Sequence, residues 1–93
     1  MKKQKFDSVW DAIEPSRAKA ANMKARAEMM IAIRKAVAAW GLTQTATAQR
    51  LGLTQPRLND LLRGRINKFS LDALINVATA AGLAVRVEIV QAA

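Results

Sequence analysis

The residues best suited to recognition chemistry lie in one short stretch, where four polar side chains fall within six positions: Gln55, Arg57, Asn59 and Asp60. Amide, guanidinium and carboxylate groups can form directed hydrogen bonds with the edges of DNA bases. The surrounding residues 43–70 hold five basic side chains against one acidic side chain, a local net charge of +4. Because DNA phosphates attract such charge, the stretch predicts a surface that binds nucleic acid.

Covalent and metal chemistry is not expected from this sequence. Its 93 residues include no cysteine and no histidine, which excludes thiolate and imidazole metal ligands, disulfide bonds and histidine-based acid–base catalysis. The serines Ser8, Ser16 and Ser70 are interpreted as helix caps, since no general base stands near any of them in the sequence. We therefore expect no catalytic residue, no metal, no cofactor and no enzyme activity.

Composition limits the size of the protein and the class of its partner. The length suits one small domain, and much of the 52% hydrophobic content is alanine, so the core is expected to be thin and a second subunit would help. The net charge of +8 favours a polyanionic partner. The longest apolar runs have five residues, far fewer than the roughly 20 of a membrane span. With no signal-peptide pattern, we expect a cytoplasmic protein, associated with the nucleoid through DNA.

Capping residues and glycines predict the helices that position these side chains. Thr43, Thr54 and Ser70 precede helices expected at residues 44–51, 55–63 and 71–81, and a glycine follows each of them. A long helix over residues 17–40 and a short one near the N-terminus are predicted from the helical spacing of two apolar sets: Met30, Ile33, Val37 and Trp40, and Phe6, Val9, Trp10 and Ile13.

The two short helices at residues 44–51 and 55–63 have the layout of a helix-turn-helix. Ala48 allows the helices to approach closely, and Gly52 suits the sharp turn between them. Four leucines are expected to face inward and hold the second helix, which in this motif enters the DNA major groove: Leu51, Leu53, Leu58 and Leu61. The alternative is an ordinary helical hairpin that binds nothing.

After Gly82 the apolar period changes from helical spacing to alternation. Leu83, Val85, Val87 and Ile89 occupy every second position, which predicts a β-strand with one apolar face. No other segment is expected to form a strand, so we expect this one to pair antiparallel with its copy in a two-fold dimer. The expected organisation is a tail and short helix (1–22), a helix-turn-helix domain (23–82) and a dimerisation strand (83–93).

Several motifs resemble the Xre-type (Cro/repressor-like) helix-turn-helix family. Leu42-Thr43-Gln44, Arg50-Leu51-Gly52 and Thr54-Gln55-Pro56-Arg57 carry this resemblance in the motif, together with Asp60-Leu61-Leu62-Arg63-Gly64. Residues 6–13, 20–26 and 69–74 further resemble HigA-like antitoxins, a subgroup of that family. The similarity covers about residues 6–90.

The resemblance implies a mainly α fold of four to five helices, here with one C-terminal strand. It also implies a homodimer that binds a palindromic operator in double-stranded DNA. Such proteins commonly repress their own operon, and many neutralise a small RelE-like ribonuclease toxin, as in HigBA-type operons. The alternative is a stand-alone Xre-family repressor without a toxin partner.

The resemblance also assigns roles to individual residues. Gln55 would read adenine, Arg57 guanine and Asp60 cytosine, while Pro56, a departure from the polar residue of many relatives, would touch a thymine methyl group. Gln44 would bond a phosphate and brace the second helix. The full set of expected phosphate contacts is Thr43, Gln44, Thr54, Arg63, Arg65 and Lys68.

Some residues keep two interpretations. Asp60 either faces DNA or pairs with Arg63 or Arg57 along its helix, which would contribute about 0.2–0.5 kcal/mol. Arg50 is either a DNA contact or a solvated surface charge. A toxin would bind either the strand edge or an acidic patch on the N-terminal helix, formed by Asp7, Asp11 and Glu14.

Overall fold

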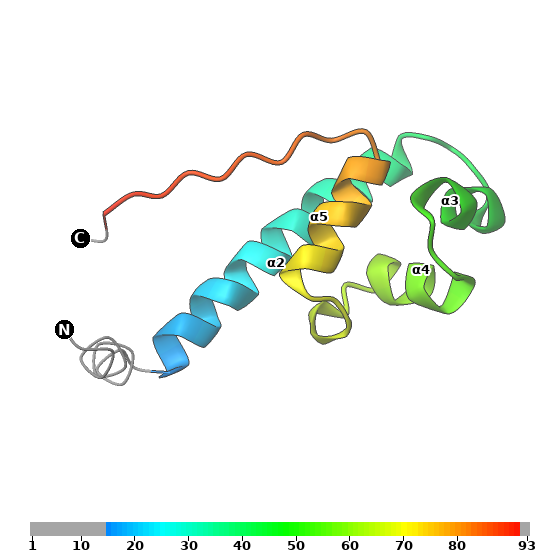
Figure 1. Ribbon diagram of the computed structural model, residues 1–93. Helices are drawn as coiled ribbons and strands as arrows, with labels where there is room; N and C mark the ends of the chain where they lie inside the picture. Colours follow the sequence, from blue (N-terminus) through cyan, green and yellow to red (C-terminus); the bar gives the residue numbers. More distant parts are fainter. Residues whose placement is uncertain (1–14, 92–93) are drawn as a thin grey trace.

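The computed structural model describes residues 15–91 of the chain (Figure 1). This part contains α2 (Pro15–Ala38), α3 (Gln44–Leu51), α4 (Gln55–Leu62), the short 3₁₀ helix η1 (Ile66–Lys68) and α5 (Leu71–Ala80). The expected tail and N-terminal helix, with Phe6, Trp10 and the acidic patch, lie outside the described residues. The mainly helical architecture predicted from the sequence is confirmed.

Three helix starts lie where the capping residues predict them. The long helix α2, predicted over residues 17–40, instead spans Pro15–Ala38, so Ser16 lies inside it. The hydroxyl groups of Thr43, Thr54 and Ser70 each accept a hydrogen bond from the backbone N–H three residues later, which satisfies one of the free N–H groups of a helix start. The ends of α4 and α5 each come one residue earlier than predicted, a difference within the fraying of a last turn.

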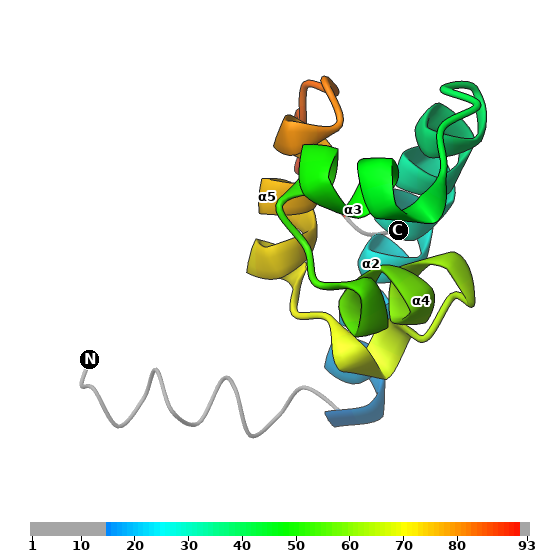
Figure 2. The same cartoon turned by 90° about the vertical axis from the view of Figure 1, so that its right-hand side faces the viewer.

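The core lies where α2 crosses the other helices. In Figure 2, α3 and α4 lie in front of α2, with α5 beside them; α2 packs against α5, η1 and α4, and α3 packs against α4 and α5. The predicted apolar face of α2 is buried: Met30, Ile33 and Val37 belong to the core, and the partly buried Trp40 packs against it. The largest side chains that are almost completely buried are Phe69, Ile33, Leu58, Leu61 and Leu74.

Helix α2 extends beyond this core. Residues 16–22 are exposed along the whole of its first part, where the sequence offers alanine and basic residues but few large apolar side chains. The helix runs without a break across residue 22, the expected boundary between the N-terminal segment and the helix-turn-helix domain. No helix within residues 15–91 is long and apolar enough to cross a membrane.

The C-terminal segment corrects one prediction. Leu83, Val85, Val87 and Ile89 were predicted to form a β-strand, but no strand occurs among the described residues. The segment runs extended away from the end of α5 in Figure 1. Among residues 83–91, the backbone of Leu83 alone bonds to another described residue, its N–H donating to the Ala78 carbonyl at 2.9 Å. A strand requires a hydrogen-bonded neighbour, and the described part of this chain offers none.

Candidate DNA-binding surface

The turn between α3 and α4 fixes the angle of the second helix. Gly52 adopts a left-handed conformation, with φ of 70°, which costs little for glycine. The N–H of Leu53 then donates to the Ala48 carbonyl at 2.9 Å, closing the end of α3. Ala48 is buried at 4% exposure, so its small side chain lets the two helices meet closely.

The buried face of α4 is apolar and its other face is polar. Leu58 and Leu61 point into the core at 1% and 0% exposure, and Leu51 of α3 lies beside them at 4%. Gln55, Pro56 and Asn59 are exposed, while Arg57 and Asp60 are half-buried. The inward leucines and outward polar residues therefore lie as the sequence predicts, and α4 presents its first turn to solvent.

Gln55 also braces the start of α4 against α3. Its side-chain amide, Nε2, donates to the Thr45 hydroxyl at 3.0 Å. Gln44, which was expected to brace the second helix, is instead exposed at the first position of α3. The observed brace instead joins two residues that lie ten positions apart, and no local pattern indicates such a pair.

Arg57 lies flat against the connection between α4 and α5. Its guanidinium carbon is 4.0 Å from the centre of the Phe69 ring, and Nη1 donates to the Lys68 carbonyl. Stacking on an aromatic face and a carbonyl contact leave most of the five guanidinium N–H groups available. Arg57 thus links α4 to η1 while keeping donors for a ligand.

Asp60 pairs with Arg65, a partner that the sequence analysis did not name. Arg65 Nη1 lies 3.0 Å from Asp60 Oδ1, with the aspartate side chain 17% exposed and the arginine side chain 47% exposed. Both residues are therefore neutralised locally when nothing is bound. Arg63, at the end of α4, and Lys68, in η1, are exposed, so their charges face solvent.

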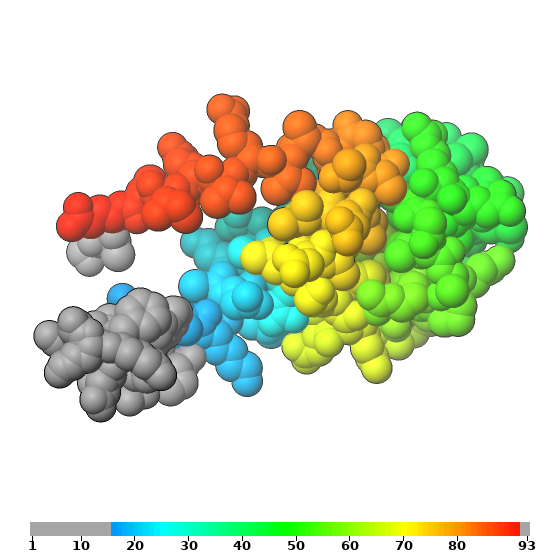
Figure 3. Space-filling model, in the orientation of Figure 1, coloured from blue at the N-terminus to red at the C-terminus, as the bar shows by residue number. Residues whose placement is uncertain are grey.

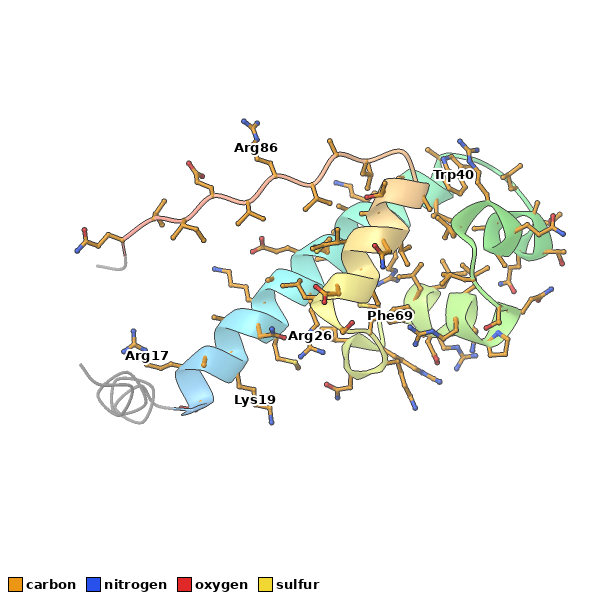
Figure 4. The ribbon with its side chains drawn as sticks, viewed as in Figure 1. Arg17, Lys19, Arg26, Trp40, Phe69 and Arg86 are labelled. Atoms are coloured by element: carbon orange, nitrogen blue, oxygen red, sulfur yellow. The ribbon has the colours of Figure 1, made fainter. Side chains whose placement is uncertain are left out.

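Arg26 is a residue of this region that sequence reasoning missed. It lies on α2, and its Nη1 donates to the carbonyls of Ile66 and Phe69, at 3.1 Å each. Its Nη2 lies 3.1 Å from Met23 Sδ, and its Nε is buried with no hydrogen-bond partner among the described residues. Figure 4 shows Arg26 and Phe69 in the same region of the molecule. Arg26 precedes Met30 by four positions, so it lies on the same face of α2 as the buried residues Met30, Ile33 and Val37. Helical spacing could therefore have identified it as a charged residue on a buried face.

Arg50 has an intramolecular partner as well. Its guanidinium carbon lies 3.9 Å from the centre of the Trp40 ring, a cation–π geometry. Trp40 is half-buried against the core, so Arg50 covers its outer face. Arg50 is therefore not a fully solvated charge, because one face of its guanidinium group lies against Trp40.

Together these residues form a basic surface around α4. The exposed start of α4, the caps Thr43 and Thr54, and the cations Arg63, Arg65 and Lys68 all belong to the segment from α3 to η1. Free N–H groups at a helix start favour anions, and the surrounding cations add to that preference. No group of three or more metal-binding side chains occurs in the described part of the chain.

The chain matches a family model described as a helix-turn-helix domain, over residues 13–90. The match includes all the elements described above and most of the C-terminal segment. No curated protein sequence matches the chain.

Proposed function

The chain belongs to this family of helix-turn-helix domains, and on that premise we propose that it is a sequence-specific transcriptional regulator that places α4 in the DNA major groove. The observation that carries the proposal is the exposed first turn of α4, held by the Thr54 cap and the Gln55–Thr45 bond and flanked by the exposed cations Arg63 and Lys68. In this motif the residues at the start of the second helix contact base edges.

The proposed base contacts are Gln55, Pro56, Arg57 and Asp60. Three of these side chains, all but Pro56, contact other residues of the chain, and DNA would have to replace those contacts. Gln55 would exchange its Thr45 bond for an adenine edge. Asp60 would release Arg65 to accept from cytosine, and Arg65 would then be free for a phosphate. Arg57 would leave the Phe69 ring and the Lys68 carbonyl for guanine. The proposed phosphate contacts, Thr43, Gln44, Thr54, Arg63, Arg65 and Lys68, would position the helix without reading sequence.

We also propose that the regulator acts as a homodimer on a palindromic operator. Support comes from the apolar side chains that the C-terminal segment exposes and from the thin, alanine-rich composition. Two α4 helices related by a two-fold axis would read half-sites separated by about 10–10.5 base pairs or a multiple of that distance.

A narrower proposal is that the protein is the antitoxin and autorepressor of a HigBA-type toxin–antitoxin operon. Its support is the resemblance of residues 20–26 and 69–74 to HigA-like antitoxins. The alternative is a stand-alone repressor. Co-expression with the neighbouring gene product separates them: growth rescue and co-purification of a small RelE-like toxin support the antitoxin, and their absence leaves the repressor.

DNA binding itself is tested by selection from random duplexes, followed by fluorescence anisotropy on the selected site and on scrambled duplex. We expect a palindromic consensus, tighter binding to that site, and affinity that falls steeply with salt through counterion release. Equal affinity for selected and scrambled duplex would contradict sequence-specific regulation, and no binding to either would contradict the DNA-binding role.

A further inference from the structure

The C-terminal segment, residues 83–91, leaves the body of the molecule as an extended chain with rising apolar exposure. Val85 is 40% exposed, Val87 73% and Ile89 87%. Beyond Leu83, its backbone N–H and C=O groups have no hydrogen-bond partner among the described residues. Figure 3 shows the far end of the segment standing clear of α2. An extended edge of this kind is a template for another strand.

The segment also forms one wall of an apolar groove with a volume of about 460 Å³. The opposite walls come from α2 and α5, with Met29, Ala32 and Ile75 among the lining residues. In Figure 4 the Arg86 side chain points away from α2. Because side chains alternate along an extended chain, Val85 and Val87 lie on the face opposite Arg86, and Glu88 shares the face of Arg86.

We propose that a second copy of this chain occupies the exposed edge, with its residues 83–91 antiparallel to those of the first about a two-fold axis at Val87. This inference rests on the proposed homodimeric regulator and specifies how its two chains pair. Charge complementarity favours this occupant, because the register places Arg86 opposite the partner's Glu88 and, by symmetry, Glu88 opposite the partner's Arg86. Val85 then lies opposite the partner's Ile89 on the apolar face.

Other registers are less favourable on the same residues. An axis at Arg86 would oppose two arginines, and an axis at Glu88 would oppose two glutamates, and like charges directly opposite each other destabilise a strand pair. An axis at Val85 or Ile89 leaves both charges opposite uncharged residues. An axis between two residues pairs the apolar face of one strand with the charged face of the other. Only Val87 as the centre gives two opposite-charge pairs and places Val85, Val87 and Ile89 of both chains on one apolar face.

The register is tested by disulfide trapping, since the chain has no cysteine of its own. In Val87→Cys the two introduced thiols face each other across the axis, within the roughly 4.4–6.8 Å Cα separation that a disulfide spans. In the matched controls Val85→Cys and Ile89→Cys, each thiol lies four residues from its copy along the strands, about 13 Å. We expect mild oxidation to convert Val87→Cys almost wholly to a covalent dimer and both controls to remain uncrosslinked. Equal trapping in all three variants, or none in Val87→Cys, overturns the register.

A charge exchange tests the same pairing without a covalent bond. Arg86→Glu and Glu88→Arg each place like charges opposite one another twice in the dimer, and each should weaken dimerisation on the order of tenfold. The double variant Arg86→Glu/Glu88→Arg restores both pairs and should recover the parental dimer constant, as measured by sedimentation equilibrium. A double variant that is weaker than either single variant, or a parental protein that stays monomeric, overturns the proposal.

These measurements are made without DNA, so they test the strand pairing separately from the proposed DNA-binding function. Trapped dimers that bind no DNA would preserve the strand pairing and contradict the regulator. A monomeric chain that binds a selected DNA site would preserve the DNA-binding role and contradict the pairing.

Discussion

The segment from α3 to η1 and the C-terminal segment differ in whether their exposed groups find partners inside one chain. In the first, Gln55 bonds Thr45, Arg57 lies on Phe69, and Asp60 holds Arg65. In the second, Val87 and Ile89 extend into solvent with their backbone unpaired among the described residues. In the free protein the side chains of the first region are thus held by partners within one chain, and DNA binding would exchange several of these contacts, whereas the second region needs another molecule to bury its apolar face. We therefore assign DNA reading and assembly to separate segments.

The largest expected effect is on the free energy of unfolding, which a substitution in the core under α4 should lower far more than one in the C-terminal segment. Leu61 is fully buried under α4, so Leu61→Ala should cost about 2–5 kcal/mol of unfolding free energy through lost burial and a cavity. Ile89→Ala, an apolar truncation in the C-terminal segment, should leave the unfolding free energy of the monomer within about 0.5 kcal/mol. Urea denaturation at protein concentrations low enough to favour monomer measures both. Similar losses in both variants would show that the C-terminal segment is part of the single-chain fold.

The next effect tests whether α2 supports the DNA-reading region from a distance. Arg26→Ala removes the guanidinium donor from the Ile66 and Phe69 carbonyls, although the Ile66 carbonyl keeps the Phe69 N–H, and the loss should cost about 1–3 kcal/mol of stability. It should also weaken DNA binding, because η1 carries Lys68 and anchors Arg57. Lys24→Ala is the matched control: Lys24 is an exposed base on the same helix. Urea denaturation and anisotropy on the selected site are the measurements. An Arg26→Ala variant with parental DNA affinity would confine Arg26 to a role in stability.

The boundaries of α3, α4 and α5 and the inward face of α4 could be predicted from the sequence, to within a residue, because they depend on local chemistry. Thr54 caps a helix through the N–H three residues later, and Gly52 supplies a left-handed turn within one residue. The partners of the polar side chains could not be predicted in this way. Arg26 and Phe69 are 43 positions apart, and Gln55 and Thr45 are ten, so their contacts depend on how the helices pack. The 3₁₀ turn at Ile66–Lys68 was missed for the same reason, since buried Phe69 pulls the connection inward.

The predicted strand is absent from the described part of the single chain for a different physical reason. Alternation at Leu83, Val85, Val87 and Ile89 describes which face is apolar, but a strand exists only when a neighbouring backbone completes the hydrogen bonds. The sequence pattern therefore predicted the extended conformation and the apolar face. It could not supply a partner that the described part of a single chain does not contain.

A smaller effect distinguishes reading from positioning within the basic surface. Arg57→Ala should cost about 1–3 kcal/mol on the selected site and relax preference at one base pair, because a bidentate base contact is lost. Lys68→Ala should weaken selected and scrambled duplexes alike and reduce the magnitude of the salt slope by about 1. Anisotropy across a salt series measures both. Equal losses of Arg57→Ala on selected and scrambled DNA would assign Arg57 to the phosphates, or to bracing η1 through Phe69.

The smallest effect concerns the Asp60–Arg65 ion pair, which tests how firmly the DNA-reading region is held before binding. Because Arg65 is largely exposed, the pair should contribute at most about 1 kcal/mol to stability. A double-mutant cycle with Asp60→Asn and Arg65→Gln in urea denaturation measures that coupling. On DNA the two variants should act in opposite directions on scrambled duplex: Asp60→Asn removes a negative charge and frees Arg65, so affinity rises, whereas Arg65→Gln removes a cation and affinity falls. If Asp60→Asn lowered affinity on scrambled duplex instead, the ion pair would be needed to hold Arg65 in its binding position, and Asp60 would support phosphate binding rather than release Arg65.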